Sequence, residues 1–482
     1  MRFRQIFRLI GILNLFLGLS MLAPLSVSLI FSDGSFYPLL YSLVITSGSG
    51  ITLFSLVKKT DYSSLSQREG MAIVTLGWLS AGFFGSLPFL LSGSVGTITD
   101  AYFESISGFT TTGASIVSNI ESLPHGILFW RSLTQWMGGM GIIVLSIAIL
   151  PFLGVGGMQL YKAEIPSPVV DKLQPRISET AKTLWKVYLL ITALEIGLLS
   201  AGGMPVFDTI CHAFCTMPTG GFSTQNGSIA QYNSAYFEGV ITVFMLLAGV
   251  NFSLHFKFLK GDFRVFDRDP ECRVFLFILA IFVLLATYNI YGTVYHSIGN
   301  AFRYAAFQVT SIITTTGFVT ANYEKWPALS QIILVLCMFI GAMTRSTGGA
   351  IKIMRIILLV KHGYQEIFRL VHPHAVRPIK LGGKPVPEDV LNSVWGFFIL
   401  YMALFIVAVI IMSSLGLDIV ASFASVAATI GNVGPGFGLV GPIGNYLSVP
   451  DPGKWALIFC MVLGRLEIYT VIIMLAPAYW QK

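Results

Sequence analysis

Long apolar stretches alternate with short polar segments along the whole chain. A helix rises about 1.5 Å per residue and the hydrocarbon core of a bilayer is about 30 Å thick, so about 20 apolar residues suffice for one crossing. Ten stretches meet this length, at residues 5–31, 37–57, 70–92, 127–152, 183–203, 235–256, 274–291, 329–361, 392–415 and 454–479. The pattern therefore predicts an all-α polytopic membrane protein with ten transmembrane helices.

Four further segments are too short to cross the membrane but lie between full-length stretches. They occupy residues 99–112, 206–219, 300–316 and 418–433, and each ends in small, hydroxyl-bearing or glycine residues. Non-helical backbone at membrane depth is tolerated only where it is buried in protein or lines a wet cavity. A plain Gly/Thr turn is the alternative for any one segment. Together, the four segments favour four re-entrant pore loops around one pore.

The spacing of these segments predicts internal repeats. The key glycines Gly113, Gly220, Gly317 and Gly434 are 107, 97 and 117 residues apart. This length holds one span, one short helix, one glycine loop and a second span, which is an M1-P-M2 repeat. We divide the chain into an extra N-terminal two-span segment, 1–68, and four pore repeats, 69–165, 166–262, 263–385 and 386–482.

Charge is scarce and unevenly distributed. Charged residues make up 11% of the chain and the mean hydropathy is +0.76, whereas a soluble domain has about 25% charged residues. If the N-terminus is cytoplasmic, 24 of the 30 Lys and Arg residues fall on the cytoplasmic side, three outside and three at membrane depth. Cytoplasmic loops carry such an excess. We therefore expect a multi-pass protein of the cell inner membrane with both termini cytoplasmic.

The external acids and one arginine at membrane depth, Arg131, need separate interpretation. Six acids fall in predicted external loops: Asp100, Glu121, Asp208, Glu324, Asp418 and Asp451. They either make the outer mouth negative and concentrate cations, or serve as ordinary loop residues. Arg131 stands near the external end of its helix, where it can snorkel to the surface, so we assigned it no role.

The ends of the four short segments supply the candidate ion-binding residues. Carbonyl oxygens turned toward one axis can replace the hydration shell of an alkali cation, and glycine permits the positive φ that aligns them. The candidates are Thr111, Thr112, Gly113, Thr219, Gly220, Gly221, Thr315, Thr316, Gly317, Asn432, Val433 and Gly434. We expect K⁺ to pass along their backbone carbonyls as cargo, with no cofactor in this chain and no nucleic acid partner.

Four motifs carry a resemblance to a known family. They are Thr-Thr-Thr-Gly at 110–113 and 314–317, Gly-Gly-Phe-Ser-Thr at 220–224 and Asn-x-Gly-Pro-Gly at 432–436. The chain resembles the Trk/Ktr/HKT superfamily of K⁺ transporters, and the two extra N-terminal spans make it most similar to Trk-type pore subunits. The resemblance implies that Gly113, Gly220, Gly317 and Gly434 sit at the selectivity filter. Glycine at position 113, where Na⁺-preferring members have serine, favours K⁺.

The resemblance also implies partners in the bilayer and the cytoplasm. Trk-type pore subunits look like homodimers that sit on a cytoplasmic ring of nucleotide-binding, TrkA-like regulatory subunits. The basic loops 158–182, 257–273 and 362–391 would offer the docking surface. This chain has no glycine-rich loop between a strand and a helix to cradle phosphates, so nucleotide sensing would belong to the partner.

A gate is expected where one long stretch contains small and polar residues. Residues 329–361 would form a helix of about 50 Å, but Thr-Arg-Ser-Thr-Gly-Gly at 344–349 predicts a break. The family has a gate loop here, at about 341–351, which makes Arg345, Gly348 and Gly349 gating candidates. We expect Arg345 to point away from the pore; the alternative is that it tightens the closed state. Glu467 is a hypothetical partner for Arg345.

Arg465 is the fourth gating candidate, in Gly-Arg-Leu-Glu at 464–467. A charge within a span is costly and usually marks function. The resemblance implies that this arginine approaches the gate loop from the cytoplasmic half of the cavity and sets an electrostatic barrier. The alternative is an arginine satisfied by helix-end carbonyls.

The sequence thus favours K⁺ uptake through a four-loop selectivity filter, gated by an intramembrane loop and a cytoplasmic regulatory subunit. Na⁺- or H⁺-coupled symport is the first alternative, with Glu195 and Glu467 as the candidate intramembrane carboxylates. An intramembrane enzyme is a remote alternative, because no span presents paired carboxylates, a His-x₃-His face or a Ser/His pair.

Overall fold

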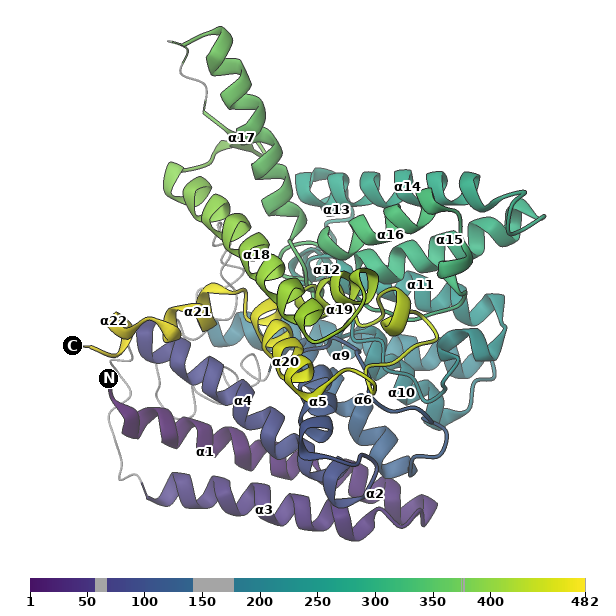
Figure 1. Ribbon diagram of the computed structural model, residues 1–482, viewed down its shortest axis with the longest axis vertical. Coiled ribbons are helices and arrows are strands. Elements are labelled where there is room, and N and C mark those ends of the chain that lie inside the picture. The colour runs from purple at the N-terminus through teal and green to yellow at the C-terminus, as the bar shows by residue number, and fades with distance from the viewer. Residues whose placement is uncertain (57–66, 142–176, 374, 376–377, 482) are drawn as a thin grey trace.

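The computed structural model describes residues 1–56, 67–141, 177–373, 375 and 378–481, and these are almost entirely helical. The strands among them are β1 (Lys380–Leu381) and β2 (Lys384–Pro385), which form a short antiparallel hairpin. Figure 1 shows the helices packed into one body from which α17 (Ile353–Val371) projects. The predicted repeat boundary at 165, part of the stretch 127–152 and part of the basic loop 158–182 lie outside the described residues.

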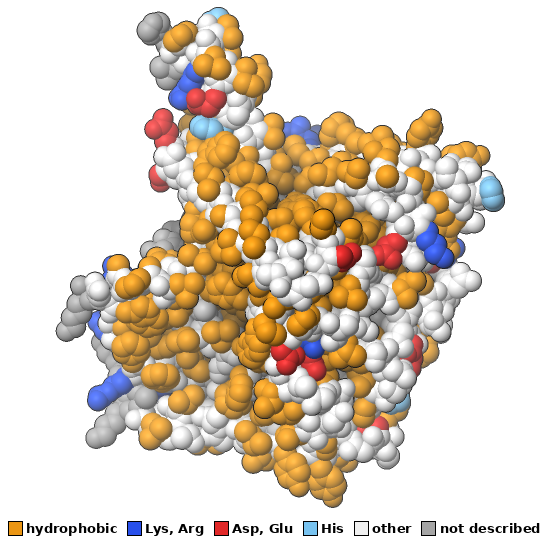
Figure 2. Space-filling model, in the orientation of Figure 1, with side chains coloured by type: hydrophobic (Ala, Val, Ile, Leu, Met, Phe, Trp, Pro, Cys, Tyr) orange, Lys and Arg blue, Asp and Glu red, His pale blue; other side chains and the backbone are white. Residues whose placement is uncertain are grey.

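Six described helices are long and apolar enough to cross a membrane. They are Phe3–Phe31, which comprises α1 (Phe3–Ser20) and α2 (Leu22–Phe31), then α3 (Phe36–Ser55), α4 (Gln67–Leu91), α9 (Ile177–Ala201), α14 (Pro270–Ile290) and α18 (Glu388–Ser414). A seventh candidate is the pair α11 (Ala235–Gly249) and α12 (Phe252–Leu259), bent by 101°. Figure 2 shows hydrophobic side chains over much of one face. The chain is therefore a multi-span α-helical membrane protein.

The three remaining stretches are not continuous helices within the described residues. The stretch 329–361 contains α16 (Ala328–Phe339), breaks, and resumes at α17, as predicted from its centre. The stretch 454–479 contains α20 (Asp451–Arg465) and the short α21 (Tyr469–Leu475), separated at Glu467 and Ile468, which have φ of 58° and 52°. The stretch 127–152 begins as α6 (His125–Gly139).

Four short helices occupy the predicted re-entrant segments. They are α5 (Ile98–Phe109), α10 (Val206–Thr216), α15 (Ile298–Ile313) and α19 (Ile419–Ile430). Thr97 and Asp418 cap the first and last of them by accepting hydrogen bonds from Asp100 and Ala421 N–H groups. Their C-terminal halves are buried, so each helix delivers the residues that follow it to the interior.

The packing of these helices is cyclic. Each short helix packs between the two helices that flank it in the chain: α5 between α4 and α6, α10 between α9 and α11, α15 between α14 and α16, and α19 between α18 and α20. Each also contacts a helix of another unit, in the pairs α6 with α10, α11 with α15, α16 with α19, and α20 with α5. The last pair closes the circle.

The two ends of the chain lie together. Phe3 near the N-terminus stacks on Trp480 near the C-terminus, with ring centroids 6.2 Å apart. Figure 1 shows both ends at the same edge of the body. The N-terminal helices pack on the first unit, α1 against α4 and α2 against α6.

Candidate functional site

The residues after the four short helices share one backbone conformation. Positive φ angles occur at Thr111 (52°), Thr219 (57°), Thr315 (60°) and Asn432 (52°), and two residues later at Gly113 (77°), Gly221 (77°), Gly317 (82°) and Gly434 (95°). The residue between them donates its N–H to the carbonyl five positions earlier: Thr112 to Ser107 (2.9 Å), Gly220 to Cys215 (2.9 Å), Thr316 to Ser311 (2.8 Å) and Val433 to Ala428 (2.8 Å). The four loops are therefore structural counterparts.

This pattern moves the key glycine of the second loop by one residue. Gly221, and not Gly220, has the positive φ of Gly113, Gly317 and Gly434. Gly220 instead matches Thr112, because it makes the equivalent N–H hydrogen bond. The predicted key glycine of the second repeat, Gly220, is therefore not the structural counterpart of Gly113, Gly317 and Gly434.

The four glycines bring the loops together in a ring. A β carbon added to any of them would lie under 3.0 Å from a carbonyl oxygen of another loop, closer than real β carbons approach. The pairs are Gly113 with Gly220, Gly221 with Thr316, Gly317 with Val433, and Gly434 with Thr112. We call these four glycines and four carbonyl groups the glycine ring. Only a residue without a side chain permits this approach, so the ring explains why glycine stands at each position.

Side chains from behind hold the ring in place. Gln135 on α6 donates from Nε2 to the Gly220 carbonyl at 2.7 Å and accepts from the Phe222 N–H at 3.0 Å. Tyr446 donates its hydroxyl to the Gly434 carbonyl at 2.7 Å. Gln135 was missed in the sequence, where its signal is a single amide within an apolar stretch.

An outer cavity of 570 Å³ opens on one side of the ring and is lined by all four ring glycines. Arg131 also lines it and is buried, with its Nε 2.6 Å from Oε1 of the buried Glu104. Arg131 also donates from Nη1 to the Ser223 carbonyl at 2.9 Å. The interpretation of Arg131 as a snorkelling residue without a role is therefore wrong: it joins the first two loops.

Several of the predicted external acids tie the outer loops together. Asp100 pairs with the buried Lys454 at 2.6 Å. Glu121 accepts from the Asn226 N–H at 2.8 Å, and Glu324 accepts from the Gly438 N–H at 2.6 Å. These contacts favour the structural interpretation of the acids over that of free charges at a negative mouth.

The break between α16 and α17, residues 340–352, lies on the other side of the ring; we call it the inner loop. Its Thr347 donates from Oγ1 to the Met217 carbonyl at 3.0 Å, and Gly349 donates its N–H to Thr315 Oγ1 at 2.7 Å. A β carbon on Gly349 would lie under 3.0 Å from the Gly431 carbonyl oxygen. The inner loop thus touches the second, third and fourth of the loops that form the glycine ring.

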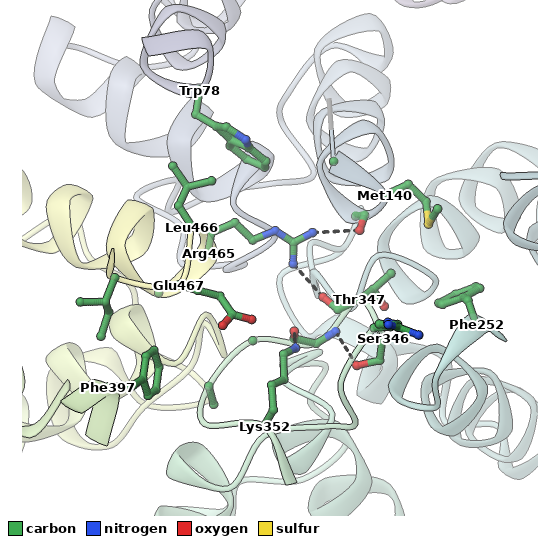
Figure 3. Close-up of a pocket in the computed structure, with 18 of the residues that line it drawn as sticks. Trp78, Met140, Phe252, Ser346, Thr347, Lys352, Phe397, Arg465, Leu466 and Glu467 are labelled. Carbon is green, nitrogen blue, oxygen red and sulfur yellow. Dashed lines mark hydrogen bonds between the residues drawn. The ribbon is translucent and has the colours of Figure 1, made fainter. Parts of the chain in front are cut away.

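Arg465 joins the inner loop to the first repeat. Its Nη1 donates to the Thr347 carbonyl at 2.7 Å, and its Nη2 donates to the Gly138 and Gly139 carbonyls at 2.6 and 2.9 Å. Arg465 therefore both satisfies helix-end carbonyls and reaches the inner loop, while its role as an electrostatic barrier stays a prediction. Figure 3 shows Arg465, Glu467 and Lys352 extending toward one inner cavity of 110 Å³.

The other charges of the inner cavity pair differently from the sequence hypothesis. Glu467 forms an ion pair with Arg355, so the hypothesis that it neutralises Arg345 is wrong. Arg345 has φ of 61°, lines the inner cavity and accepts the Phe252 N–H on its carbonyl at 3.2 Å. Lys352, which the sequence analysis did not single out, donates its ammonium to the Gly348 carbonyl. Its only sequence signal is a lysine within the apolar stretch 329–361.

The fold and the site define a class of protein: a multi-span α-helical membrane protein in which four re-entrant segments close a ring between an outer and an inner cavity. A family model described as TrkH, Cation transport protein, matches residues 41–482, and the chain belongs to this family. Membership makes it a transport protein and not an enzyme.

Named relatives match over the whole length. The chain is 44% identical to the Trk system potassium uptake protein TrkH of Salmonella typhimurium, over all of both chains. It is 35% identical to the Trk system potassium uptake protein TrkG of Escherichia coli, over 99% of both chains. It also resembles the crystal structure of the potassium transporter TrkH from Vibrio parahaemolyticus, with a TM-score of 0.90, 40% identity and full coverage of both chains.

Proposed function

We propose that this chain carries K⁺ across the membrane through the glycine ring, with the inner loop as its gate. The observation that carries the proposal is the closure of the ring: four counterpart loops, one from each repeat, meet glycine to carbonyl in cyclic order. The family and the names of the relatives, potassium uptake proteins, supply the cargo.

The ring offers what a dehydrated alkali cation needs. Backbone carbonyls can replace the hydration shell of a cation. The spacing of the carbonyl oxygens decides for which cation this replacement costs little free energy. The short helices α5, α10, α15 and α19 end at the ring, so their partially negative C-termini favour a cation there. Gln135 and Tyr446 stiffen the carbonyls of Gly220 and Gly434 from behind. In the proposal, Thr111, Thr112 and the other ten positions chosen from the sequence form the path along which K⁺ passes.

The inner loop and Arg465 account for gating. Thr347, Gly348 and Gly349 lie directly against the loops of the glycine ring, and in the proposal they block the inner exit. A unit positive charge about 5 Å from a permeating K⁺ costs about 3 kcal/mol at an effective dielectric constant of about 20. Opening therefore requires movement of the inner loop, and with it the Arg465 side chain bound to Thr347.

Coupled symport receives less support. Glu467 is paired with Arg355, and Glu195 is buried in α9 and lines neither the outer nor the inner cavity. Glu195 is thus separate from the path, and Glu467, which lines the inner cavity, is already paired with a cationic side chain.

The finer membrane arrangement belongs to the same proposal. It comprises ten spans in four repeats, a location in the inner membrane with both termini cytoplasmic, a homodimer, and a TrkA-like regulatory ring as partner. The stacking of Phe3 on Trp480 supports one location for both termini, and the relatives' membership of a Trk system supports a partner. Mass measurement in detergent tests the dimer.

The deciding experiment is ion flux into proteoliposomes that contain this chain alone, comparing K⁺ with Na⁺. Gly113→Ser should abolish K⁺ preference, because its β carbon meets the Gly220 carbonyl. The matched control is Gly197→Ala in α9, where a β carbon meets nothing within 4 Å; its flux should equal the wild type. Flux that requires an imposed Na⁺ or H⁺ gradient would favour symport instead, and K⁺ preference that survives Gly113→Ser would remove the ring from the filter.

A further inference from the structure

Glu271 stands at the start of α14 and turns toward the inner loop. Pro270 opens the helix, and Asp269 caps it by accepting the Cys272 N–H at 2.8 Å. The Glu271 side chain, one residue further on, is 3% exposed. A buried carboxylate at this depth is costly unless hydrogen-bond donors satisfy it, so its partners decide its role.

One oxygen of Glu271 binds both Thr344, within the inner loop, and Met354, just after it. Oε1 accepts from the Thr344 N–H at 2.7 Å, the Thr344 hydroxyl at 3.0 Å and the Met354 N–H at 3.1 Å. Met354 is the second residue of α17, whose first-turn N–H groups have no partner within the helix. The carboxylate therefore caps α17 and binds Thr344 of the inner loop at the same time.

The two partners of Glu271 stand on either side of the residues that contact the glycine ring. Thr344 and Met354 enclose the segment 345–353, which contains Thr347 and Gly349 and their contacts to the filter loops. Because one oxygen joins both ends, the enclosed segment cannot swing away from the ring as a unit while all three hydrogen bonds persist.

We propose that Glu271 is the positioning residue of the gate: its carboxylate joins Thr344 of the inner loop to the first turn of α17 and thereby holds the loop closed against the glycine ring. The inference rests on the proposed gating role of the inner loop. Loss of the carboxylate should raise basal K⁺ flux without changing the preference for K⁺ over Na⁺, since no residue of the ring contacts Glu271 through these bonds.

The test compares Glu271→Ala, Glu271→Gln and the control Asp269→Asn in proteoliposomes without a regulatory subunit. Glu271→Ala should raise K⁺ flux about tenfold, which corresponds to about 1.4 kcal/mol in the gating equilibrium. Glu271→Gln keeps one acceptor oxygen and the side-chain volume, so it should lie between Ala and wild type, and it serves if the Ala variant does not fold. Asp269→Asn removes a charge from the same turn but keeps its cap acceptor, and its flux should equal the wild type.

Amide hydrogen exchange supplies a readout that does not depend on transport. Peptides containing Thr344 and Met354 should exchange faster in Glu271→Ala than in Asp269→Asn. Faster exchange with unchanged or reduced flux would overturn the proposal and leave Glu271 as a cap of α17 only. Unchanged exchange would also overturn it, because it would show that the hydrogen bonds of Glu271 to Thr344 and Met354 do not form in the membrane. If wild-type protein carries no K⁺, the proposed function fails, whereas the exchange result still reports on Glu271.

Discussion

The α carbon of Gly221 faces the carbonyl oxygen of Thr316 so closely that a β carbon on Gly221 would lie under 3.0 Å from it. Gly220, its neighbour, has no positive φ, and a β carbon there would meet the side-chain amide of Gln135 instead. A side-chain amide can move, whereas a backbone carbonyl of the ring cannot. The two adjacent glycines therefore differ in what they tolerate.

Gly221→Ala should accordingly damage K⁺ selectivity more than Gly220→Ala does. Alanine at φ of 77° adds about 1–3 kcal/mol of backbone strain to the steric conflict with Thr316. Parallel measurements of K⁺ and Na⁺ flux in proteoliposomes separate the two variants. Equal loss in both, or greater loss in Gly220→Ala, would contradict the one-residue shift of the second loop.

Arg465→Ala should increase K⁺ flux through the chain alone. It removes one positive charge and the three hydrogen bonds that join Thr347 to the end of α6. Arg465→Lys should give an intermediate flux, because a lysine ammonium keeps the charge but cannot span two sets of carbonyls as the guanidinium fork does. Arg369→Ala, an exposed arginine on α17, is the control and should leave flux unchanged. Reduced flux in Arg465→Ala would argue against a closing role.

Glu104→Gln should destabilise the protein by about 3–5 kcal/mol, because it leaves the charge of Arg131 buried and without its carboxylate. The measurement is thermal unfolding in detergent. The double variant Glu104→Gln, Arg131→Gln is the matched control and should be less destabilised than the single one. A harmless single variant would show that the ion pair is dispensable. The third repeat supports the design, since Gln308 stands nine residues before Gly317, as Glu104 does before Gly113.

Asp33 predicts an acid-dependent loss of stability at the attachment of the N-terminal helices. It lies in the turn between α2 and α3, outside the candidate spans, and accepts the Gly126 N–H of α6 at 2.6 Å. Burial raises the pKa of the Asp33 carboxyl, but hydrogen bonds from Ser28, Gly126 and Ser35 outweigh it, so the pKa is lowered from 3.8. A lowered folded-state pKa contributes stability that is present above 3.8 and is lost as the pH falls through the folded value.

The Asp33 contribution is testable by thermal unfolding in detergent from neutral pH down to about pH 3. Asp33→Asn should lower the unfolding midpoint at neutral pH and flatten the decline at the acidic end. A variant that keeps the wild-type midpoint at neutral pH would show that the turn does not hold the N-terminal helices.

Local signals account for most of what the sequence revealed. Apolar length alone located the helices that cross, and Thr-Thr-Thr-Gly at 110–113 and 314–317 identified two of the four loops at once. The break in 329–361 was readable from its small residues. In contrast, the break after Arg465 was not predicted, because Leu-Glu-Ile at 466–468 has no helix-breaking composition.

Distant contacts account for what the sequence did not reveal. Gln135 and the Gly220 carbonyl are 85 residues apart, and Glu271 and Thr344 are 73 residues apart. Glu271 also follows Pro270 in a first helical turn, where an acid is expected for the helix dipole alone. The two adjacent glycines of the second loop were indistinguishable until hydrogen bonds and φ angles fixed their register.

The carbonyls of the glycine ring come from Thr112, Gly220, Thr316 and Val433, four residues of three different kinds. A pore assembled from identical subunits must accept every substitution four times over. Here a substitution at one position changes one of the four ring carbonyl positions and leaves the other three positions unchanged. The four sides of the ring can therefore be changed independently of one another, each by a substitution at its own position in the chain.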